Sequence, residues 1–476
     1  MKNLTIPTYF DSVPHREMLA EYPIGPDFVS RFARMSRDEL RQQQNHRFVS
    51  VMKRAWEIPF YRRLWSGAGL TPADVRSLDD IERLPTYSKA DLMRSVDEHP
   101  PFGDFHGMES FGGEPRPVIV FQTTSGTTGK PLPLLYGPKS REMQNLLLAR
   151  AYLLQGLRAS DIVQSVYAHG LVNGGHYVRE TFLHFTSALF ISAGTGVETR
   201  SRAQVELMRH FGVTVLVGFP DYIRHLADVA REMGIVPGRD VKIRMIVGQL
   251  GGESRAALAD AWAGAEGRAD APEVFDWYGV ADAGVVAAEG PDHAGLYLWE
   301  DAHHVEILDV DSGAPVVDGR PGNVCVTVLF KDDVFPMVRY NTNDVSAIDP
   351  SPSPLGLPLR RLTGVVGRSD NMIKLRGINV YPTAIGEMLQ GPPGVTGEYL
   401  CRVDHIRGRD EMTVLIEVRG DPADRPSLMA SYRELFKRRL GVDVLVEIVD
   451  PGSLLPLTGA GAQQKPVRLI HNRFER

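Results

Sequence analysis

The stretch from Thr123 to Pro131 reads TTSGTTGKP and directly follows the strand-like run VIVFQ at residues 118–122. Small hydroxyl and glycine residues let backbone N–H groups crowd around a polyanion, and Lys130 adds a positive charge beside them. The spacing differs from that of the nucleotide-kinase loop, because only two residues separate the glycines and Pro131 stands where Mg²⁺ binding needs Ser or Thr. The stretch predicts a phosphate-binding loop, with an ordinary polar turn as the alternative.

Outward from this loop the sequence pattern changes several times. Residues 1–120 are mainly helical in pattern, and short β-rich runs then alternate with helix-like segments, which predicts a largely parallel, helix-covered sheet. Residues 295–365 are richer in β patterns, and a strand–helix–strand pattern closes the chain. We therefore expect an α/β protein with a large N-terminal domain of helix-covered sheets and a β-rich subdomain at 1–367, and a small, mobile α+β lid domain at 368–476.

Bulk composition narrows the classes of function. The 476 residues are 43% hydrophobic and 24% charged, and the formal net charge of −6 comes without a long basic run. The composition argues against a disordered chain. The charge pattern argues against nucleic acid or a membrane surface as the main partner, because both require clustered Lys and Arg. Cys325 and Cys401 are the two cysteines, and neither a signal peptide nor a membrane-length apolar run is present, so we expect a cytoplasmic protein.

Further segments follow the loop in order. They are GGES at 251–254, DWYGVADAG at 276–284, RYNTNDVSAID at 339–349, GRSDNMIKLRGINVYP at 367–382 and KPVRLIHNR at 465–473. Together with TTSGTTGKP they resemble, in the same order, the motifs of the adenylate-forming superfamily of acyl-CoA synthetases, carrier-protein adenylation domains and luciferases. The likeness is greatest to the phenylacetate–CoA ligase branch and extends from about residue 120 to residue 473.

The resemblance implies an ATP site in which an aromatic residue, Tyr278, stacks on adenine and the Asp344 carboxylate accepts both ribose hydroxyls. Lys130 and Thr127 of the loop are implied in catalysis. The full set of implied ATP-binding residues is Thr124, Ser125, Gly126, Thr127, Thr128, Gly129, Lys130, Gly251, Gly252, Glu253, Asp276, Trp277, Tyr278, Gly279, Asp344, Arg368 and Lys465.

Metal and hinge positions are implied in the same way. Asp282 falls where the family usually has a Mg²⁺-binding Glu, and its shorter side chain reaches the ion only through a shifted backbone or a water. Asp370 is the implied pivot of the C-terminal domain. The implied hinge and thiol-tunnel residues are Asp370, Lys374, Arg376 and Gly377.

An acyl pocket is implied by two more segments, YAHGLVNGGHYVRE at 167–180 and GFPDYI at 218–223. For His169, also a candidate catalytic residue, the alternative is a satisfied core histidine, and for Asp221 it is the N-cap of a following helix. If Asp221 instead faces the pocket, an amino- or hydroxy-bearing aromatic acid is favoured. The implied acid-binding residues are Tyr167, His169, Asn173, Gly174, Gly175, Phe219 and Asp221.

The catalytic lysine near the C-terminus depends on alignment. Counting from Pro456 and Thr458 places the family's lysine position on Ala462, whereas matching KPVRLIHNR to the ending of the phenylacetate branch places it on Lys465. The second alignment matches more residues, and a glycine-rich loop absorbs extra length at little entropic cost. We therefore expect Lys465 to reach the α-phosphate, with a solvated surface lysine as the alternative.

Taken together, the resemblance predicts an AMP-forming ligase that activates a carboxylic acid, most readily an aromatic one, with ATP and Mg²⁺ and passes the acyl group to coenzyme A. Loading of a carrier protein, or adenylation of another acid such as nitrite for arylamine diazotisation, are the alternatives within the superfamily. A non-catalytic nucleotide-binding module is the alternative from another class. By analogy with the branch we expect a homodimer.

Overall fold

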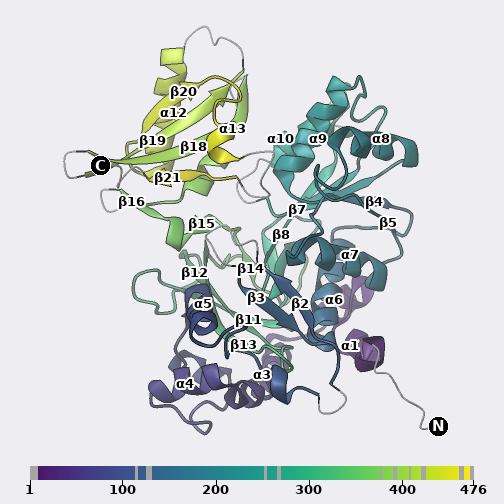
Figure 1. The fold of residues 1–476 in the computed structure, drawn as a ribbon, viewed down its shortest axis with the longest axis vertical. Coiled ribbons are helices and arrows are strands. Elements are labelled where there is room, and N and C mark those ends of the chain that lie inside the picture. The colour runs from purple at the N-terminus through teal and green to yellow at the C-terminus, as the bar shows by residue number, and fades with distance from the viewer. Residues whose placement is uncertain are drawn as a thin grey trace. The chain divides into compact units, whose positions relative to one another are not determined.

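The computed structural model describes residues 9–112, 116–124, 131–250, 255–264, 270–375, 378–389, 394–406, 409–419, 425–459 and 466–471. The chain forms two compact units, and many of their elements are labelled in Figure 1. Unit 1 consists of Met1–Thr199 and Phe275–Gly364, and unit 2 consists of Arg200–Val274 and Val365–Arg476. Arg200–Val274 is thus grouped with the C-terminal residues, and the domain boundary at 367/368 stays a prediction.

Unit 1 begins with the expected helical region. Local signals start several of its helices: Ser36 and Glu39 form a capping box at α3, and Pro59 occupies the first turn of α4, where its missing N–H costs nothing. The elements are η1 (Phe10–Ser12), α1 (His15–Glu21), α2 (Gly25–Phe32), α3 (Arg37–Glu57), α4 (Pro59–Gly67), η2 (Leu78–Arg83), β1 (Tyr87–Ser88), α5 (Lys89–Glu98) and η3 (Met108–Ser110).

The centre of unit 1 is built around one enclosed helix, α6 (Pro138–Leu154), which buries residues on all of its sides. Six of these are polar: Ser140, Arg141, Glu142, Gln144, Asn145 and Arg150. Buried polar groups require partners, so this helix must be surrounded by matching donors and acceptors. Its neighbours in sequence are β2 (Val120–Thr123), β3 (Pro133–Tyr136), β4 (Ile162–Ser165), α7 (Asn173–Phe185) and β5 (Leu189–Ser192).

Strands in the rest of unit 1 are mostly antiparallel. β8 (Glu273–Val280), β9 (Gly284–Glu289), β10 (Leu296–Leu298) and β14 (Arg361–Leu362) pair in that order, each antiparallel to the next. A second sheet has the order β1–β13–β12–β11, with β11 (His303–Leu308), β12 (Gly322–Val328) and β13 (Met337–Ser346). In unit 1, β4 pairs parallel with β5 and β1 pairs parallel with β13. The β-rich region at 295–365 is as expected, and its strands pair mainly antiparallel.

The first segment of unit 2 alternates helices and strands as predicted. Its elements are α8 (Ser201–Phe211), β6 (Val215–Val217), α9 (Pro220–Glu232), β7 (Met245–Gly248) and α10 (Arg255–Trp262). Strands β6 and β7 pair in parallel, which requires a crossover, and α9 supplies it. Gly212 ends α8 with a φ of +66°, a left-handed conformation that glycine adopts without strain.

The C-terminal segment of unit 2 folds around a sheet in the order β20–β19–β18–β21. One face of α12, formed by Leu428, Tyr432, Leu435 and Leu440, packs into the core of this segment. Gly441 ends the helix with a φ of +74°. The elements are β15 (Gly367–Arg368), η5 (Ser369–Asn371), β16 (Ile373–Leu375), β17 (Ile378–Val380), η6 (Pro382–Ala384), α11 (Ile385–Met388), β18 (Val395–Ile406), β19 (Arg409–Val418), α12 (Arg425–Leu440), β20 (Leu445–Val449), α13 (Leu455–Thr458) and β21 (Leu469–His471).

The chain is therefore a mixed α/β protein with several sheets and helices around them. No helix in the described parts of the chain combines the length and apolar character needed to cross a membrane.

Candidate functional site

The stem of the predicted phosphate loop is a β-hairpin. Strands β2 and β3 pair antiparallel, with Val120 opposite Tyr136 and Thr123 opposite Pro133. Thr124 closes the stem, because its N–H donates to the Leu132 carbonyl at 3.2 Å and its Oγ1 accepts from the Leu132 N–H at 3.2 Å. The remaining predicted residues, Ser125, Gly126, Thr127, Thr128, Gly129 and Lys130, lie outside the described residues.

The predicted acyl segment joins this stem. The backbone N–H of Thr123 donates to the Leu171 carbonyl at 2.9 Å. At the start of α7, Asn173 donates from Nδ2 to the Tyr136 hydroxyl at 3.4 Å. Gly175 allows the approach of α7, since a Cβ there would stand 2.0 Å from the Ala168 carbonyl oxygen. Sequence segments around residues 123, 136 and 173 are thus held together by hydrogen bonds.

The segment around Asp282 is also hydrogen-bonded to Tyr136. The Tyr136 hydroxyl donates to the Ala281 carbonyl at 2.6 Å, and the Lys331 ammonium donates to the Asp282 carbonyl oxygen at 2.9 Å. Gln144 of α6 also donates to the Asp282 carbonyl, at 3.4 Å. The phosphate-loop stem, the acyl segment and the predicted metal residue therefore meet around Tyr136.

The Asp282 side chain has the properties expected of one carboxylate ligand to a metal ion. It is 4% exposed, and its Oδ1 is buried without a hydrogen-bond partner. Burial raises the pKa of this carboxyl, and the charge of Lys331 counteracts the increase. Burial lowers the pKa of Lys331 to about 8. Among the described residues no group of three or more His, Cys, Asp or Glu side chains could hold a metal ion, so a cation here would depend on Asp282, substrate oxygens and water.

The two residues expected at adenine and ribose lie within hydrogen-bond distance of each other. The Tyr278 hydroxyl donates to Asp344 Oδ2 at 2.9 Å and to Thr342 Oγ1 at 3.2 Å. Thr342 Oγ1 also accepts from the Asp344 N–H at 3.1 Å. Asn343 has a φ of +61°, a left-handed conformation that Asn tolerates better than most residues, and it turns the backbone directly before Asp344.

The acyl and adenine segments are also neighbours. Tyr167 is buried, which raises the pKa of its hydroxyl, and the nearby Asp276 carboxylate raises it further. Asp276 itself is fixed by its backbone, whose N–H donates to Glu289 Oε2 at 2.7 Å. Trp277 and Tyr278 are buried on β8, and Gly279 of the same strand would bring a Cβ within 2.4 Å of the Gly284 carbonyl oxygen.

His169 is half-buried rather than a core residue. Its Nε2 shares a hydrogen bond of 2.6 Å with Ser192 Oγ, and its backbone N–H donates to Glu198 Oε1 at 3.1 Å. Burial lowers the pKa of the ring, and neighbouring His176 lowers it further. The imidazole is therefore held neutral near pH 7. Gly174, by contrast with Gly175, has room for a Cβ, which would lie 3.8 Å from the Tyr167 ring.

One part of this site is absent from the predictions. Arg141 of α6, with no exposed side-chain surface, donates from Nη1 to Asn173 Oδ1 and from Nε to Glu180 Oε2 at 2.5 Å. It fixes the amide that in turn contacts Tyr136. The only sequence signal is the density of polar residues in SREMQN, which is also the pattern of a solvated helix face.

In unit 2, Asp221 lies in the first turn of α9, but the N-cap is Phe219, without a capping side-chain bond. The N-cap alternative for Asp221 is thus wrong. Its carboxylate instead accepts from Arg224 at 3.4 Å and pairs with Arg468 at 3.9 Å. Asp370, the predicted hinge, accepts from Arg368 at 2.6 and 2.8 Å.

Lys374 is exposed on the hairpin β16–β17, opposite Asn379. The other predicted residues in unit 2 lie outside the described residues. They are Gly251, Gly252, Glu253, Arg376, Gly377 and Lys465.

Comparison with known proteins places these features in a family. A profile described as AMP-binding enzyme matches residues 73–328, and one described as AMP-binding enzyme C-terminal domain matches residues 377–473. A phenylacetate–coenzyme A ligase of Aromatoleum evansii is 29% identical over 450 residues, which cover 91% of this chain and 96% of the relative.

Solved structures of CoA ligases share this fold. A 2-hydroxyisobutyryl-CoA ligase in the postadenylation state superposes with a TM-score of 0.81 at 24% identity, covering 95% of this chain and 94% of the other. The same enzyme in complex with 2-HIB-AMP and CoA in the thioesterification state gives a TM-score of 0.63 at 26% identity, covering 92% and 91%. The chain belongs to the AMP-binding enzyme family.

Proposed function

We propose that this protein is an AMP-forming acid–CoA ligase that activates a carboxylic acid with ATP and transfers the acyl group to coenzyme A. The observation that carries the proposal is the meeting of the phosphate-loop stem, the acyl segment and the Asp282 segment around Tyr136. The contact of Tyr278 with Asp344 supplies the nucleoside side of the same site. The names of the relatives support coenzyme A over a carrier protein as acceptor.

The chemistry needs no general base, because a carboxylate is already anionic near pH 7. One carboxylate oxygen attacks the α-phosphorus of ATP, the bond to the bridging oxygen breaks, and pyrophosphate leaves with the electron pair. Two anions must approach each other, so the protein's contribution is electrostatic. We assign backbone donors and hydroxyls of the loop, including Thr127, together with Lys130 and Lys465, to this task.

In the second step the thiol sulfur attacks the acyl carbon and AMP leaves with the electron pair. The thiol proton is released to solvent or to a nearby base, for which the neutral His169 imidazole is our candidate. Because the two steps need different groups at one site, we assign the change between them to rotation about Asp370, with Lys374, Arg376 and Gly377 lining the thiol path.

Mg²⁺ would neutralise charge on the phosphate oxygens, and Asp282 is the residue we assign to hold it. The unpartnered, buried Oδ1 of Asp282 supports this assignment. Requirement for Mg²⁺ is checked by pyrophosphate release during titration of the ion into metal-free enzyme.

An aromatic acid is our proposed substrate class. Tyr167 on the acyl segment is buried beside the adenine segment, and Asn173 and Gly174 lie near it along the chain. The Aromatoleum relative is named for phenylacetate. Because Asp221 is paired with two arginines, it supports an amino-bearing acid less than a free carboxylate would. We also propose a homodimer, which sedimentation analysis would check.

The test is pyrophosphate release from ATP across phenylacetate, benzoate and their hydroxy and amino derivatives, with and without coenzyme A. We expect release with an aromatic acid, with AMP and a CoA thioester as products. Release without thioester formation would indicate a carrier protein or a nitrite-type reaction. Nucleotide binding without pyrophosphate release for any acid would indicate a non-catalytic nucleotide-binding module.

Lys465→Ala gives the sharpest variant for this test. Loss of the charge aimed at the α-phosphate should lower pyrophosphate release by at least about 100-fold, in the range seen when one oxyanion donor is removed. Thioester formation from a preformed acyl adenylate should persist. Lys437→Ala, at an exposed position of α12, is the matched control and should retain both steps.

A further inference from the structure

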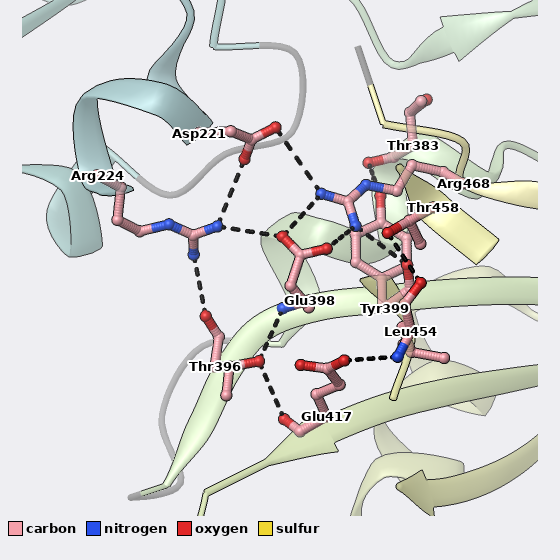
Figure 2. Close-up of polar contacts among 10 residues, drawn as sticks. All are labelled: Asp221, Arg224, Thr383, Thr396, Glu398, Tyr399, Glu417, Leu454, Thr458 and Arg468. Atoms are coloured by element: carbon pink, nitrogen blue, oxygen red, sulfur yellow. Dashed lines mark hydrogen bonds and ion pairs between the residues drawn. The ribbon is translucent and has the colours of Figure 1, made fainter. Parts of the chain in front are cut away.

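A network of four charged side chains joins helix α9 to the C-terminal segment of unit 2 (Figure 2). Glu398 on β18 accepts from Arg224 of α9 at 3.5 Å and from Arg468 at 2.7 Å. Asp221 of α9 pairs with Arg224 at 3.4 Å and with Arg468 at 3.9 Å. Two acids and two bases alternate around this network, so its net charge is zero.

The backbone of β18 is shaped to receive Arg224. The strand is irregular in its pairing with β19 between Val395 and Tyr399, and irregular strands re-aim their polar groups. In this stretch the Thr396 carbonyl accepts from Arg224 Nη1 at 3.0 Å. The next residue, Gly397, has a φ of +86°, and a Cβ there would lie 2.4 Å from Arg224 Nη1. A glycine is therefore required for this close approach.

The contact is polar, whereas each side has its own apolar support. All members of the two hydrophobic clusters of the C-terminal segment lie between Ile373 and Ile470. Helix α9 instead buries residues such as Ile223 and Leu226 and packs against α8 and α10. Contacts between separable bodies are typically more polar than a core, so the network suits a surface that docks and releases.

Partial burial gives this network more strength than a surface ion pair. The side chains of Arg224, Glu398 and Arg468 are 19%, 14% and 11% exposed. Arg468 also lies over the Tyr399 ring, at 4.6 Å from its centroid, and donates to the Tyr399 carbonyl at 3.1 Å. The Glu398 carboxylate outweighs burial and raises the pKa of Arg468. Arg468 is thus fixed to β18 and remains charged.

The position of Arg468 in the sequence connects the network to catalysis. Lys465 precedes it by three residues, a stretch that spans at most about 10 Å when extended. The network therefore lies within three residues of the lysine that we assign to the adenylation step.

We infer that Arg224 and Glu398 are positioning residues that dock the C-terminal segment on α9 for the adenylation step alone. The inference rests on the proposed function, because it takes Lys465 as the adenylation lysine. Neither residue is among those that we assign to the reacting atoms. Their removal should weaken acyl-adenylate formation and leave, or favour, the transfer of the acyl group to the thiol.

The experiment separates the two half-reactions. ATP–pyrophosphate exchange measures adenylation, and CoA thioester formation from chemically prepared acyl adenylate measures transfer. For Arg224→Gln and Glu398→Gln we expect exchange to fall about tenfold, the loss expected when one charge-assisted hydrogen bond is removed. The transfer rate should be at least that of the wild type.

Gly397→Ala disrupts the same contact without removing a charge and should give the same split between the steps. Asp443→Asn is the control, because it breaks the pair with Arg433, at 2.7 Å, inside the C-terminal segment without touching α9. It should leave both half-reactions unchanged. Hydrogen exchange of the backbone around Thr396 supplies a readout that needs no substrate, and it should accelerate in Arg224→Gln but not in Asp443→Asn.

Equal losses in both half-reactions, or no loss in either, would overturn the inference, as would unchanged hydrogen exchange. A wild-type protein that exchanges no pyrophosphate with any acid would defeat the proposed function itself. That result is distinguishable from an active wild type whose Arg224 and Glu398 variants remain equally active.

Discussion

Two polar networks of this protein differ in how deeply they are buried. One surrounds Tyr136 in unit 1 and the other surrounds Glu398 in unit 2, and both are held by hydrogen bonds and ion pairs of arginine. Arg141 has no exposed side-chain surface and its partners come from the same unit, whereas Arg224 is 19% exposed and joins two separately supported segments. A buried polar group cannot exchange its partner for water at low cost, but a partly exposed one can. The first arrangement suits a fixed pocket, and the second suits a contact that is made and broken.

The largest effect should come from removing the buried arginine. Arg141→Met removes the cation paired with Glu180 and the donor to Asn173, and breaking a buried ion pair costs several kcal/mol. Because Glu180 is 25% exposed, we expect a loss near the lower end, about 3 kcal/mol in the free energy of unfolding. Urea unfolding measures it.

Arg433→Met is the control for that variant in unit 2. It breaks an ion pair of similar length whose side chains are 52% and 29% exposed, so the loss should stay below about 1 kcal/mol. Equal losses of unfolding free energy in the two variants would show that burial does not distinguish the two regions.

A second variant tests whether the fixed pocket binds nucleotide. Asp344→Ala removes the acceptor assigned to the ribose hydroxyls and should weaken ATP binding about 100-fold with little change in unfolding, since charge-assisted hydrogen bonds contribute about 1.5–3 kcal/mol each. Isothermal calorimetry measures the change. Tyr278→Phe keeps the ring and the Asp344 carboxylate, removes the hydroxyl that donates to Asp344 and Thr342, and should cost less than tenfold. Unchanged affinity in Asp344→Ala would take this residue out of the site.

The pH dependence of stability offers a third way to separate buried from exposed groups. Burial lowers the pKa of His303 on β11 to about 4. An unfolded chain binds a proton at this residue near pH 6.5, so below that pH the unfolded state gains protons that the folded state does not. Stability is therefore complete above about pH 7 and falls as the pH drops toward 4.

For His303 alone the loss between pH 7 and pH 5 should be about 2 kcal/mol. Urea unfolding at both pH values measures it, and His303→Phe should reduce the pH dependence by that amount. His46 is exposed, and its replacement by Phe should retain the wild-type dependence. A wild-type stability that is flat from pH 7 to 5 would contradict the buried, neutral state of His303.

Sequence reasoning located the strand before the predicted loop from local pattern alone, and the structure has β2 at that place. Tyr278 and Asp344, which the family resemblance assigns to one nucleoside, lie within hydrogen-bond distance although 66 residues separate them. Only the resemblance could link these two residues, since spacing alone cannot bring two distant strands together, and their roles stay a prediction.

What the sequence could not provide were partners chosen by tertiary packing. Arg141 and Asn173 are 32 residues apart, and Asp221 meets Arg468 from the far end of the chain. An arginine in a helix is most often a solvated residue, and only the enclosure of α6 makes Arg141 a buried donor. The prediction for Asp221 as an N-cap failed for a related reason, because Phe219 and not Asp221 has the extended backbone that precedes the helix.

The smallest expected effect concerns the length of the carboxylate in the metal position. Asp282 is buried, so the extra methylene of Asp282→Glu must be accommodated by packing, at about 1 kcal/mol in the free energy of unfolding. Against this cost, the longer side chain extends a carboxylate oxygen that has no hydrogen-bond partner in the protein and is therefore available to a cation. We therefore expect Asp282→Glu to keep or improve adenylation. Half-maximal pyrophosphate release should occur at a Mg²⁺ concentration that is the same or up to a few-fold lower. A tenfold shift would require about 1.4 kcal/mol of binding free energy, and lengthening one carboxylate ligand should change that energy by less. Asp282→Asn keeps the size and removes the charge, so it should raise the Mg²⁺ requirement while sparing stability. If both variants show the Mg²⁺ dependence of the wild type, Asp282 is no ligand, and its buried carboxylate serves only the packing around Lys331.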